Sequence, residues 1–293
     1  MKKILGIALL SALFRMGSGY AAESPYFYVV AADPQLFFKQ KDDANWRKTI
    51  GLVNGLKPDF MIVCGDLIQG PNKPDAFKIE AVDKLADVYL KGAAALKGIP
   101  IYNVAGNHDV TIQPNEKTLE WYETRFGKPW YAFEHKNSLF IVLESNLIRD
   151  PSGAPEHGKR QWDWLDKTLA ETTNKPYDHK TVYMHHPLCL KSVDEKSGYF
   201  NIPLEARQDL LKRLHDHGFA AAFCGHYHRN AYVKDGELEL ITTSSCGAAL
   251  GKDPLGFRIV KVYPDRLEHA YFGFDAIPQK VLFEPEPPAA KAP

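Results

Sequence analysis

The sequence has few cysteines, no excess of either charge and no apolar run long enough to cross a membrane. Four cysteines among 293 residues are too few for a disulfide framework, and we expect no bridge between them. Lys plus Arg balances Asp plus Glu at 36 each, which argues against a nucleic-acid partner. A hydrophobic fraction of 45% is that of a globular protein, and the length fits one α/β domain.

The N-terminus has the pattern of an export signal. Lys2 and Lys3 precede an apolar stretch over residues 4–14, and small residues surround Ala21. The stretch is shorter than the roughly 20 apolar residues that a membrane span needs, and Arg15 ends it. We expect residues 1–21 to be a cleaved signal peptide, which makes the protein periplasmic or secreted, with no stable membrane insertion afterwards. The alternative is an apolar helix that stays attached.

Short apolar runs alternate with helical patterns over most of the chain, which predicts an α/β fold. The expected strands are residues 26–32, 59–64, 100–104, 140–143, 181–184 and 219–224. The expected helices are residues 43–56, 76–96, a segment around 162–169, and 204–214. The runs at 237–242, 257–262 and 267–274 predict antiparallel strands. We expect the domain to occupy residues 25–277, followed by a disordered tail rich in Pro and Ala over residues 278–293.

Polar side chains that can bind metal follow five of the expected strands. They are Asp33, Asp66, Asn107, His185 and His226. In an open α/β sheet, the carboxyl ends of the strands form the edge where ligands bind. Core packing or turn formation does not explain five such residues in this position, so the sequence predicts a polar site there.

Histidine spacing makes a metal site the favoured reading. His226 and His228 are two residues apart, and in an extended segment both would face the same side. A single histidine is more often a surface or core residue, but such a pair beside carboxylates at other strand ends is typical of metal ligands. His185 and His186 are adjacent, so only one of them should face the site.

The motifs resemble those of the calcineurin-like metallophosphoesterase superfamily. They are, in chain order, Asp33-Pro34-Gln35, Gly65-Asp66, Gly106-Asn107-His108-Asp109, His185 and Gly225-His226-Tyr227-His228. More closely, they resemble the calcineurin-like phosphoesterase domain-containing subgroup, described as serine/threonine phosphatases. The resemblance implies a fold of two facing mixed β-sheets flanked by helices.

The resemblance also implies a dinuclear site of divalent ions, with Mn, Fe, Zn and Mg all left open. Asp33 and His228 would bind the first metal, and Asp66 would bridge both. The second metal would be completed by Asn107, His185 and His226. Gln35 stands where most of the superfamily has a second histidine, and it is a candidate ligand.

The activity implied is hydrolysis of a phosphomonoester by in-line attack of a metal-activated hydroxide. His108 would act as the general acid or a transition-state stabiliser, oriented by Asp109, and Asn107 and His108 would contact substrate. The substrate would be a phosphorylated small molecule or a phosphoprotein. Alternatives are a phosphodiesterase with the same metals, or a metal-binding relative without turnover.

Other residues give weaker indications. Arg229 could contact phosphate or form an exposed salt bridge. Residues 246–252 are expected to be a loop, whose glycines alone do not make a phosphate site. Several aromatic residues could line a cleft or pack in the core, namely Phe37, Phe38, Trp130, Tyr131, Tyr199 and Phe200.

The export signal generates the first prediction. Produced in a Gram-negative host with its leader intact, the protein should be found in the periplasm. N-terminal sequencing should then give a new start near Ala22 or Glu23, because the small residues there suit cleavage. A full-length protein confined to the cytoplasm would refute the signal peptide.

Overall fold

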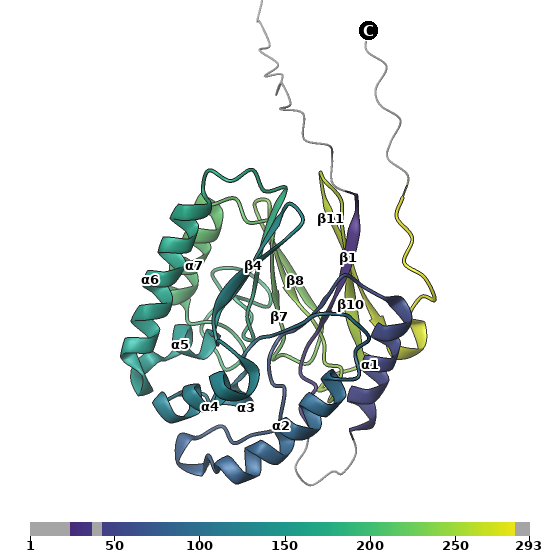
Figure 1. Ribbon diagram of the computed structural model, residues 1–293. Helices are drawn as coiled ribbons and strands as arrows, with labels where there is room; N and C mark the ends of the chain where they lie inside the picture. Colours follow the sequence, from purple (N-terminus) through teal and green to yellow (C-terminus); the bar gives the residue numbers. More distant parts are fainter. Residues whose placement is uncertain (1–23, 37–42, 285–293) are drawn as a thin grey trace, which may run out of the picture.

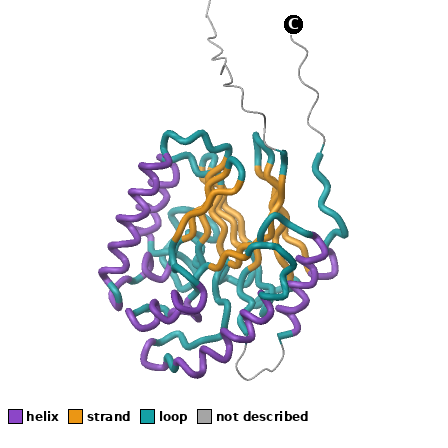
Figure 2. The backbone as a smooth tube through the Cα atoms, in the orientation of Figure 1, coloured by secondary structure: helices purple, strands orange, loops and turns teal. Residues whose placement is uncertain are grey.

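Two mixed β-sheets face each other between two layers of helices in this computed structural model, which describes residues 24–36 and 43–284 (Figures 1 and 2). The first sheet has the strand order β11-β10-β1-β2-β3. Its strands are β1 (Tyr26–Ala31), β2 (Met61–Val63), β3 (Ile101–Asn103), β10 (Gly256–Val262) and β11 (Leu267–Gly273). The second sheet has the order β4-β5-β6-β7-β9-β8. Its strands are β4 (Tyr131–His135), β5 (Ser138–Val142), β6 (His179–Tyr183), β7 (Ala221–Cys224), β8 (Ala231–Asp235) and β9 (Leu238–Thr242).

Helices cover the outer face of each sheet. Those packed with the first sheet are α1 (Ala44–Leu56), α2 (Ile79–Ala93) and α4 (Glu116–Phe126). Those packed with the second are α6 (Pro155–Thr172) and α7 (Leu204–Asp216). The short helices α3 (Asn107–Val110) and α5 (Ser145–Arg149) follow β3 and β5, and single 3-10 turns occur at Pro74–Ala76, Pro151–Gly153 and Phe274–Ala276.

The interface between the two sheets is rich in aromatic rings. Tyr28 of the first sheet stacks on Phe60 and packs edge-on against Phe140 of the second sheet. The hydroxyls of Tyr28 and Tyr183 lie 2.6 Å apart across the interface, so each buried hydroxyl has a hydrogen-bond partner. Large rings leave little freedom for one sheet to slide on the other, which fixes how their strand ends face each other.

The observed fold confirms the expected class of two facing mixed sheets flanked by helices, and each expected strand and helix forms within a few residues of its predicted bounds. The strands expected to be antiparallel in the last third are so at β10–β11 and β8–β9, but β9 also pairs in parallel with β7. Two strands were not predicted, β4 and β8, which are the edge strands of the second sheet. Their residues alternate between half-buried and exposed, so neither strand gives a continuous apolar run.

Three of the sequence-based expectations lie outside the described residues. They are the signal peptide at 1–21, the cleft candidates Phe37 and Phe38, and the tail from residue 285 onward. No helix in the described part of the chain is long and apolar enough to cross a membrane. All four cysteines are buried and unbridged.

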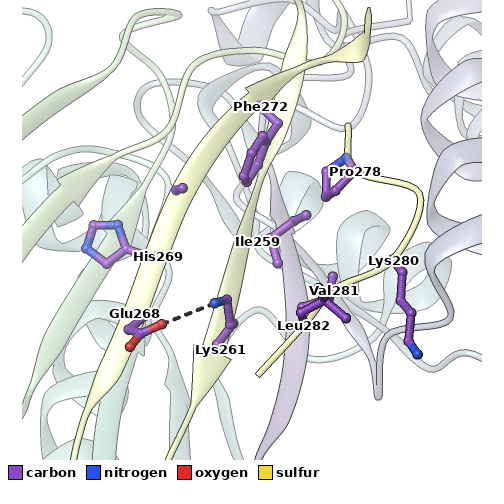
Figure 3. A pocket seen from close by; sticks show the side chains of 10 residues that line it. Ile259, Lys261, Glu268, His269, Phe272, Pro278, Lys280, Val281 and Leu282 are labelled. Atoms are coloured by element: carbon purple, nitrogen blue, oxygen red, sulfur yellow. Dashed lines mark hydrogen bonds and ion pairs between the residues drawn. The ribbon is translucent and has the colours of Figure 1, made fainter. Parts of the chain in front are cut away.

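Residues 278–284 have no regular structure but pack against the first sheet. The ring of Phe283 lies 6.3 Å from that of Phe27 and 5.8 Å from that of Tyr263. Between this segment and β10–β11 lies a hollow of about 420 Å³, which Figure 3 shows with Ile259, Phe272 and Val281 on its walls. Lys261 and Glu268 on its wall form an ion pair at 3.2 Å (Figure 3). The hollow therefore has mainly apolar walls and does not gather metal-binding groups.

The packing of α1 on α2 generates a stability prediction. The indole Nε1 of Trp46 donates to the Tyr89 carbonyl at 3.0 Å. A Cβ added to Gly92 would lie only 2.3 Å from the same Nε1 atom. Gly92→Ala should lower the free energy of unfolding by about 1–3 kcal/mol through overpacking. Gly51→Ala is the matched control, because Gly51 is helical but exposed, with nothing within 4 Å of the added methyl. It should raise stability by about 0.5–1 kcal/mol in urea denaturation. Equal effects of the two substitutions would contradict this packing account.

Candidate metal centre

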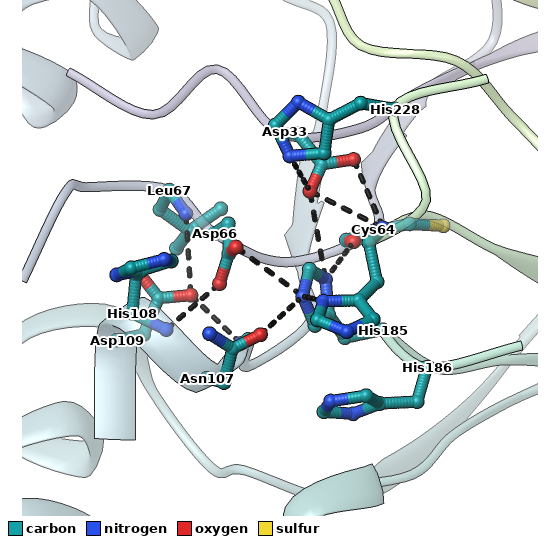
Figure 4. A network of polar contacts seen from close by, with 12 residues as sticks. Asp33, Cys64, Asp66, Leu67, Asn107, His108, Asp109, His185, His186 and His228 are labelled. Carbon is teal, nitrogen blue, oxygen red and sulfur yellow. Dashed lines mark hydrogen bonds and ion pairs between the residues drawn. The ribbon is translucent and has the colours of Figure 1, made fainter. Parts of the chain in front are cut away.

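The polar residues expected at strand ends come together at one site, which both sheets build (Figure 4). Asp33, Asp66 and Asn107 follow β1, β2 and β3 of the first sheet, and His185 and His226 follow β6 and β7 of the second. His185 is the central contact, with its Nε2 3.0 Å from Asn107 Oδ1, 3.1 Å from His226 Nδ1 and 3.3 Å from Asp66 Oδ2. The predicted gathering of these side chains is therefore confirmed.

Two buried carboxylates lie at the centre of this site. Asp33 is 0% exposed and Asp66 is 1% exposed. Among the described residues, neither has a Lys or Arg within ion-pair distance, and their ionic partners are imidazoles. Backbone amides add one further contact each, from His226 N to Asp33 and from His108 N to Asp66 Oδ1 at 2.8 Å. Two buried negative charges without a permanent cation are destabilising unless a positive charge binds beside them.

Backbone carbonyls fix three of the imidazoles. A carbonyl oxygen only accepts, so the ring nitrogen that contacts it carries the hydrogen, and the other nitrogen keeps its lone pair for the cluster. The contacts are His185 Nδ1 to Cys64 O at 2.9 Å, His226 Nε2 to Tyr199 O at 3.2 Å, and His228 Nδ1 to Ala248 O. Histidines that bind metal usually have such an acceptor on their second nitrogen, because it sets both tautomer and orientation.

The carboxylates also change the proton affinity of these rings. Burial alone would lower the pKa of His228, but the Asp33 carboxylate outweighs it and raises the pKa to about 9. In His185, Asp66 likewise overcomes the effect of burial and raises the pKa to about 9. Burial and His185 together lower the pKa of His226. Protons and a divalent cation compete for the same imidazole nitrogens, so the field that favours one also favours the other.

The donor atoms fit two divalent cations. One group comprises Asp33, Asp66 and His228, and the second His185, His186 and His226, with the ligand atoms in each group within 4.8 Å of one another. Asn107 adds an amide oxygen beside the second group. Carboxylate oxygen with imidazole nitrogen suits Zn, Mn and Fe, and the oxygen-rich side also suits Mg. Gln35 is 7% exposed and lines the adjoining cleft.

His186 departs from the expectation that only one of the two adjacent histidines faces the site. β6 ends at Tyr183, so the alternation of a strand no longer applies at His185 and His186. The His186 ring lies 4.2 Å from the His226 ring, and its Nδ1 is 2.9 Å from Ser145 Oγ. Only His185 of the two contacts Asn107 and Asp66.

The expected contact between Asp109 and His108 is corrected by the structure. The Asp109 carboxylate accepts hydrogen bonds from three backbone amides, those of Leu67, Ile68 and Gly106. Burial and Asp66 raise its pKa to about 8 despite these bonds. The ring of His108 is instead held by the Gly70 carbonyl, 2.6 Å from its Nδ1. Asp109 therefore fixes the loop backbone, and a carbonyl orients His108.

Two further residues of the site carried no signal in the sequence. Asn72 Oδ1 accepts from Asn107 Nδ2 at 2.7 Å, which directs Asn107 Oδ1 toward His185. Gln69 Nε2 lies 3.0 Å from His108 Nδ1. Asn72 stands in a turn between two prolines, and only its long-range contact with Asn107 shows its role.

A cleft of about 260 Å³ opens onto the cluster. Its walls are Gln35, Asp66, Gln69, His108, Tyr199, Phe200, His226, His228, Ala248 and Leu250. Trp130 and Tyr131, the other aromatic candidates, line a separate cleft beside α4 and α6. Arg229 does not line the metal cleft, since its guanidinium donates to Leu250 O at 2.7 Å and lies over the Tyr227 ring. Of the two expectations for Arg229, the salt bridge does not form among the described residues, and the contact with phosphate stays a prediction.

The backbone of the site is left-handed at unusual positions. Five non-glycine residues here have φ between 43° and 64°, and they are Asp33, Gln35, Asp66, His226 and His228. Such conformations cost free energy in residues with a Cβ, and they concentrate at functional sites. They also correct the picture of His226 and His228 as neighbours on an extended strand, because two left-handed turns bring both rings to the site.

Comparisons with known proteins agree with this geometry. The profile of the calcineurin-like phosphoesterase family matches residues 28–230. The chain is 32% identical over 277 residues to the serine/threonine-protein phosphatase CPPED1 of Homo sapiens, covering 88% of this chain and 87% of that protein. The Mus musculus protein of the same name is 34% identical over 275 residues, covering 88% and 86%.

Solved structures show the same fold. A dimetal phosphatase from Danio rerio superposes with a TM-score of 0.63 at 15% identity, covering 85% of this chain and 96% of that one. A purple acid phosphatase from yellow lupin, Lupinus luteus, has a TM-score of 0.61 at 16% identity, covering 87% and 52%.

The prediction for this site concerns Asp66, which is shared between the two ligand groups. It belongs to the group of Asp33 and His228, and it also contacts His185 of the other group. Asp66→Asn keeps an oxygen for the His108 amide but removes the charge, so most bound metal should be lost while the fold persists. Elemental analysis and circular dichroism measure both. Asp163→Asn, an exposed position on α6, is the control and should retain full metal content. Normal metal content in Asp66→Asn would show that this carboxylate does not bridge.

Proposed function

This chain belongs to the calcineurin-like phosphoesterase family of hydrolases that act on phosphoric ester bonds, and we propose that it hydrolyses phosphomonoesters at a dinuclear metal site. The observation that carries the proposal is a set of three carbonyl-fixed imidazoles. The free nitrogens of His185 and His228 face Asp66 and Asp33, and that of His226 faces His185. A metal-binding relative without turnover would not need His108, which lines the cleft but belongs to neither ligand group.

Two divalent ions held by these groups would supply a positive centre for a phosphate dianion and make hydroxide available near neutral pH. The chain's own residues would orient the ester. The Nδ1 hydrogen of His108 is fixed on the Gly70 carbonyl, so the doubly protonated ring would donate its Nε2 proton to the leaving oxygen and remain as the neutral Nδ1–H tautomer. Asn107, held by Asn72, would place its amide beside the phosphoryl oxygens.

The substrate class follows from the relatives and from charge. The similar human and mouse proteins are named serine/threonine-protein phosphatases, which supports a phosphorylated small molecule or a phosphoprotein as substrate. The balanced total of 36 basic and 36 acidic residues gives no support to a nucleic-acid substrate. We further propose that the protein works after export, on the strength of the N-terminal sequence pattern alone.

Paired assays test the reaction class. With added manganese, p-nitrophenyl phosphate should be hydrolysed faster than bis-p-nitrophenyl phosphate. The reverse preference would indicate a phosphodiesterase with the same ligands. Activity on neither ester, from protein that carries metal by elemental analysis, would favour a binding protein.

His108 should act in the chemistry and not in holding metal. His108→Ala is expected to leave metal content unchanged and to lower kcat by roughly 10²–10⁴, the usual range for a lost acid or base. The loss should be smaller for nitrophenyl phosphate than for alkyl phosphates, because a good leaving group needs less protonation. A uniform loss across leaving groups would leave His108 with electrostatic stabilisation only.

Gln35 lines the cleft at a position where a histidine would be a stronger ligand. Gln35→His should lower the manganese concentration that gives half-maximal activity, and metal should be retained better through dialysis. Titration of both proteins with manganese measures this. Coincident curves, with two tightly held ions in each protein, would show that Gln35 does not limit the first site.

A further inference from the structure

One wall of the metal cleft is apolar and aromatic. Tyr199, Phe200 and Leu250 line it, and they are partly open to solvent, with Tyr199 49% and Leu250 56% exposed. We propose that this wall, which we name the aromatic wall, binds an uncharged aromatic group on the organic side of the phosphomonoester. The proposal rests on the proposed function and adds a substrate class to it.

The aromatic wall begins directly beside the cluster. The Tyr199 ring lies 5.0 Å from the His226 ring, and the Phe200 ring lies 5.5 Å from it. The two aromatic rings meet edge-on at 5.0 Å and 83°, so Phe200 supports Tyr199 from the side. A phosphoryl group at the cluster would therefore place its organic substituent within reach of both rings.

Two arginines hold the segment that carries these rings. Residues 184–203 contain no helix or strand, yet Arg149 donates to Tyr199 O at 2.6 Å and lies 3.5 Å from Gly198 O. Arg207 is fully buried and donates to the carbonyls of Val193, Glu195 and Ile202. In the described part of the chain, the hydrogen bonds of both guanidinium groups go to main-chain carbonyls of this segment, so both charges act on its backbone.

The segment is fixed from within as well. The Glu195 carboxylate accepts from the amides of Leu190 and Lys191 and from the Asn201 side chain. A wall fixed before the substrate arrives loses less conformational entropy on binding, which favours a defined, flat partner. Chain flexibility would instead be expected of a surface that adapts to many partners.

Charge argues against an acidic organic group. The residues that line the cleft include no Lys and no Arg. The two guanidinium groups that contact its walls are both engaged with main-chain carbonyls, Arg229 with Leu250 O and Arg149 with Tyr199 O. A second phosphate or an acidic peptide would therefore find no counter-charge beyond the cluster itself. The amides of Gln35 and Gln69 face a neutral substituent without such a cost, and aromatic rings favour stacking with another ring.

The experiment compares benzyl phosphate with ethyl phosphate, whose leaving alcohols have similar acidity, so that the difference reports binding of the ring. We expect kcat/KM to be about 10-fold higher for benzyl phosphate, the effect of one aromatic contact together with its buried area. In calorimetry on the metal-loaded protein, benzylphosphonate should bind about 10-fold more tightly than ethylphosphonate. This second readout does not require turnover.

Variants locate the effect. Tyr199→Ala should bring both ratios toward one, while Tyr199→Phe should keep them, because the ring and not the hydroxyl is proposed to stack. Tyr232→Ala, a half-exposed tyrosine on β8, is the matched control and should leave both ratios unchanged. Metal content is measured for each variant, since the Tyr199 carbonyl contacts His226.

The outcomes separate the two proposals. Hydrolysis of both esters with equal kcat/KM, together with equal phosphonate binding, overturns the aromatic wall and leaves the phosphatase intact. Hydrolysis of neither ester overturns the proposed function, and the phosphonates then decide the aromatic wall alone. A benzyl preference that survives in Tyr199→Ala overturns the assignment to these residues.

Discussion

The site depends on two buried carboxylates, Asp33 and Asp66, that have no permanent cation beside them in the described structure. Their negative charge draws His185 and His228 close. The main chain also packs closely around both carboxylates. A Cβ on Gly106 would lie 2.1 Å from Asp66 N, and one on Gly225 would lie 2.8 Å from Asp33 Oδ2. Strained and glycine-dependent backbone is tolerated because it brings ligands to one point.

The arrangement divides the work between sheets and loops. The ligands lie directly after strands of the two sheets, and the aromatic interface around Tyr28 and Tyr183 fixes the separation of the two halves of the cluster. The loops shape what enters, since residues 184–203 supply the aromatic wall and the segment after Cys246 supplies Leu250. Substrate preference can therefore change in the loops while the metal geometry stays constant.

The sequence predicted an α/β fold and a polar site at the strand ends because both leave local patterns. Polar residues that follow apolar runs, such as Asp66 and His185, mark strand ends, and strand ends meet at one edge. Edge strands β4 and β8 were missed because they alternate instead of forming runs. Asn72, the role of Asp109 and the carbonyl contact of Arg229 could not be predicted, since each depends on a contact with a distant or backbone group.

The carbonyls that fix the imidazoles belong to the main chain, and this has a consequence for how the protein tolerates mutation. The acceptors at Cys64, Tyr199 and Ala248 persist whatever side chain those positions carry, provided that the backbone keeps its path. Genetic drift at these positions can therefore leave metal binding intact. The carbonyl contacts that set each tautomer therefore survive single side-chain substitutions, and alanine scanning would not detect them.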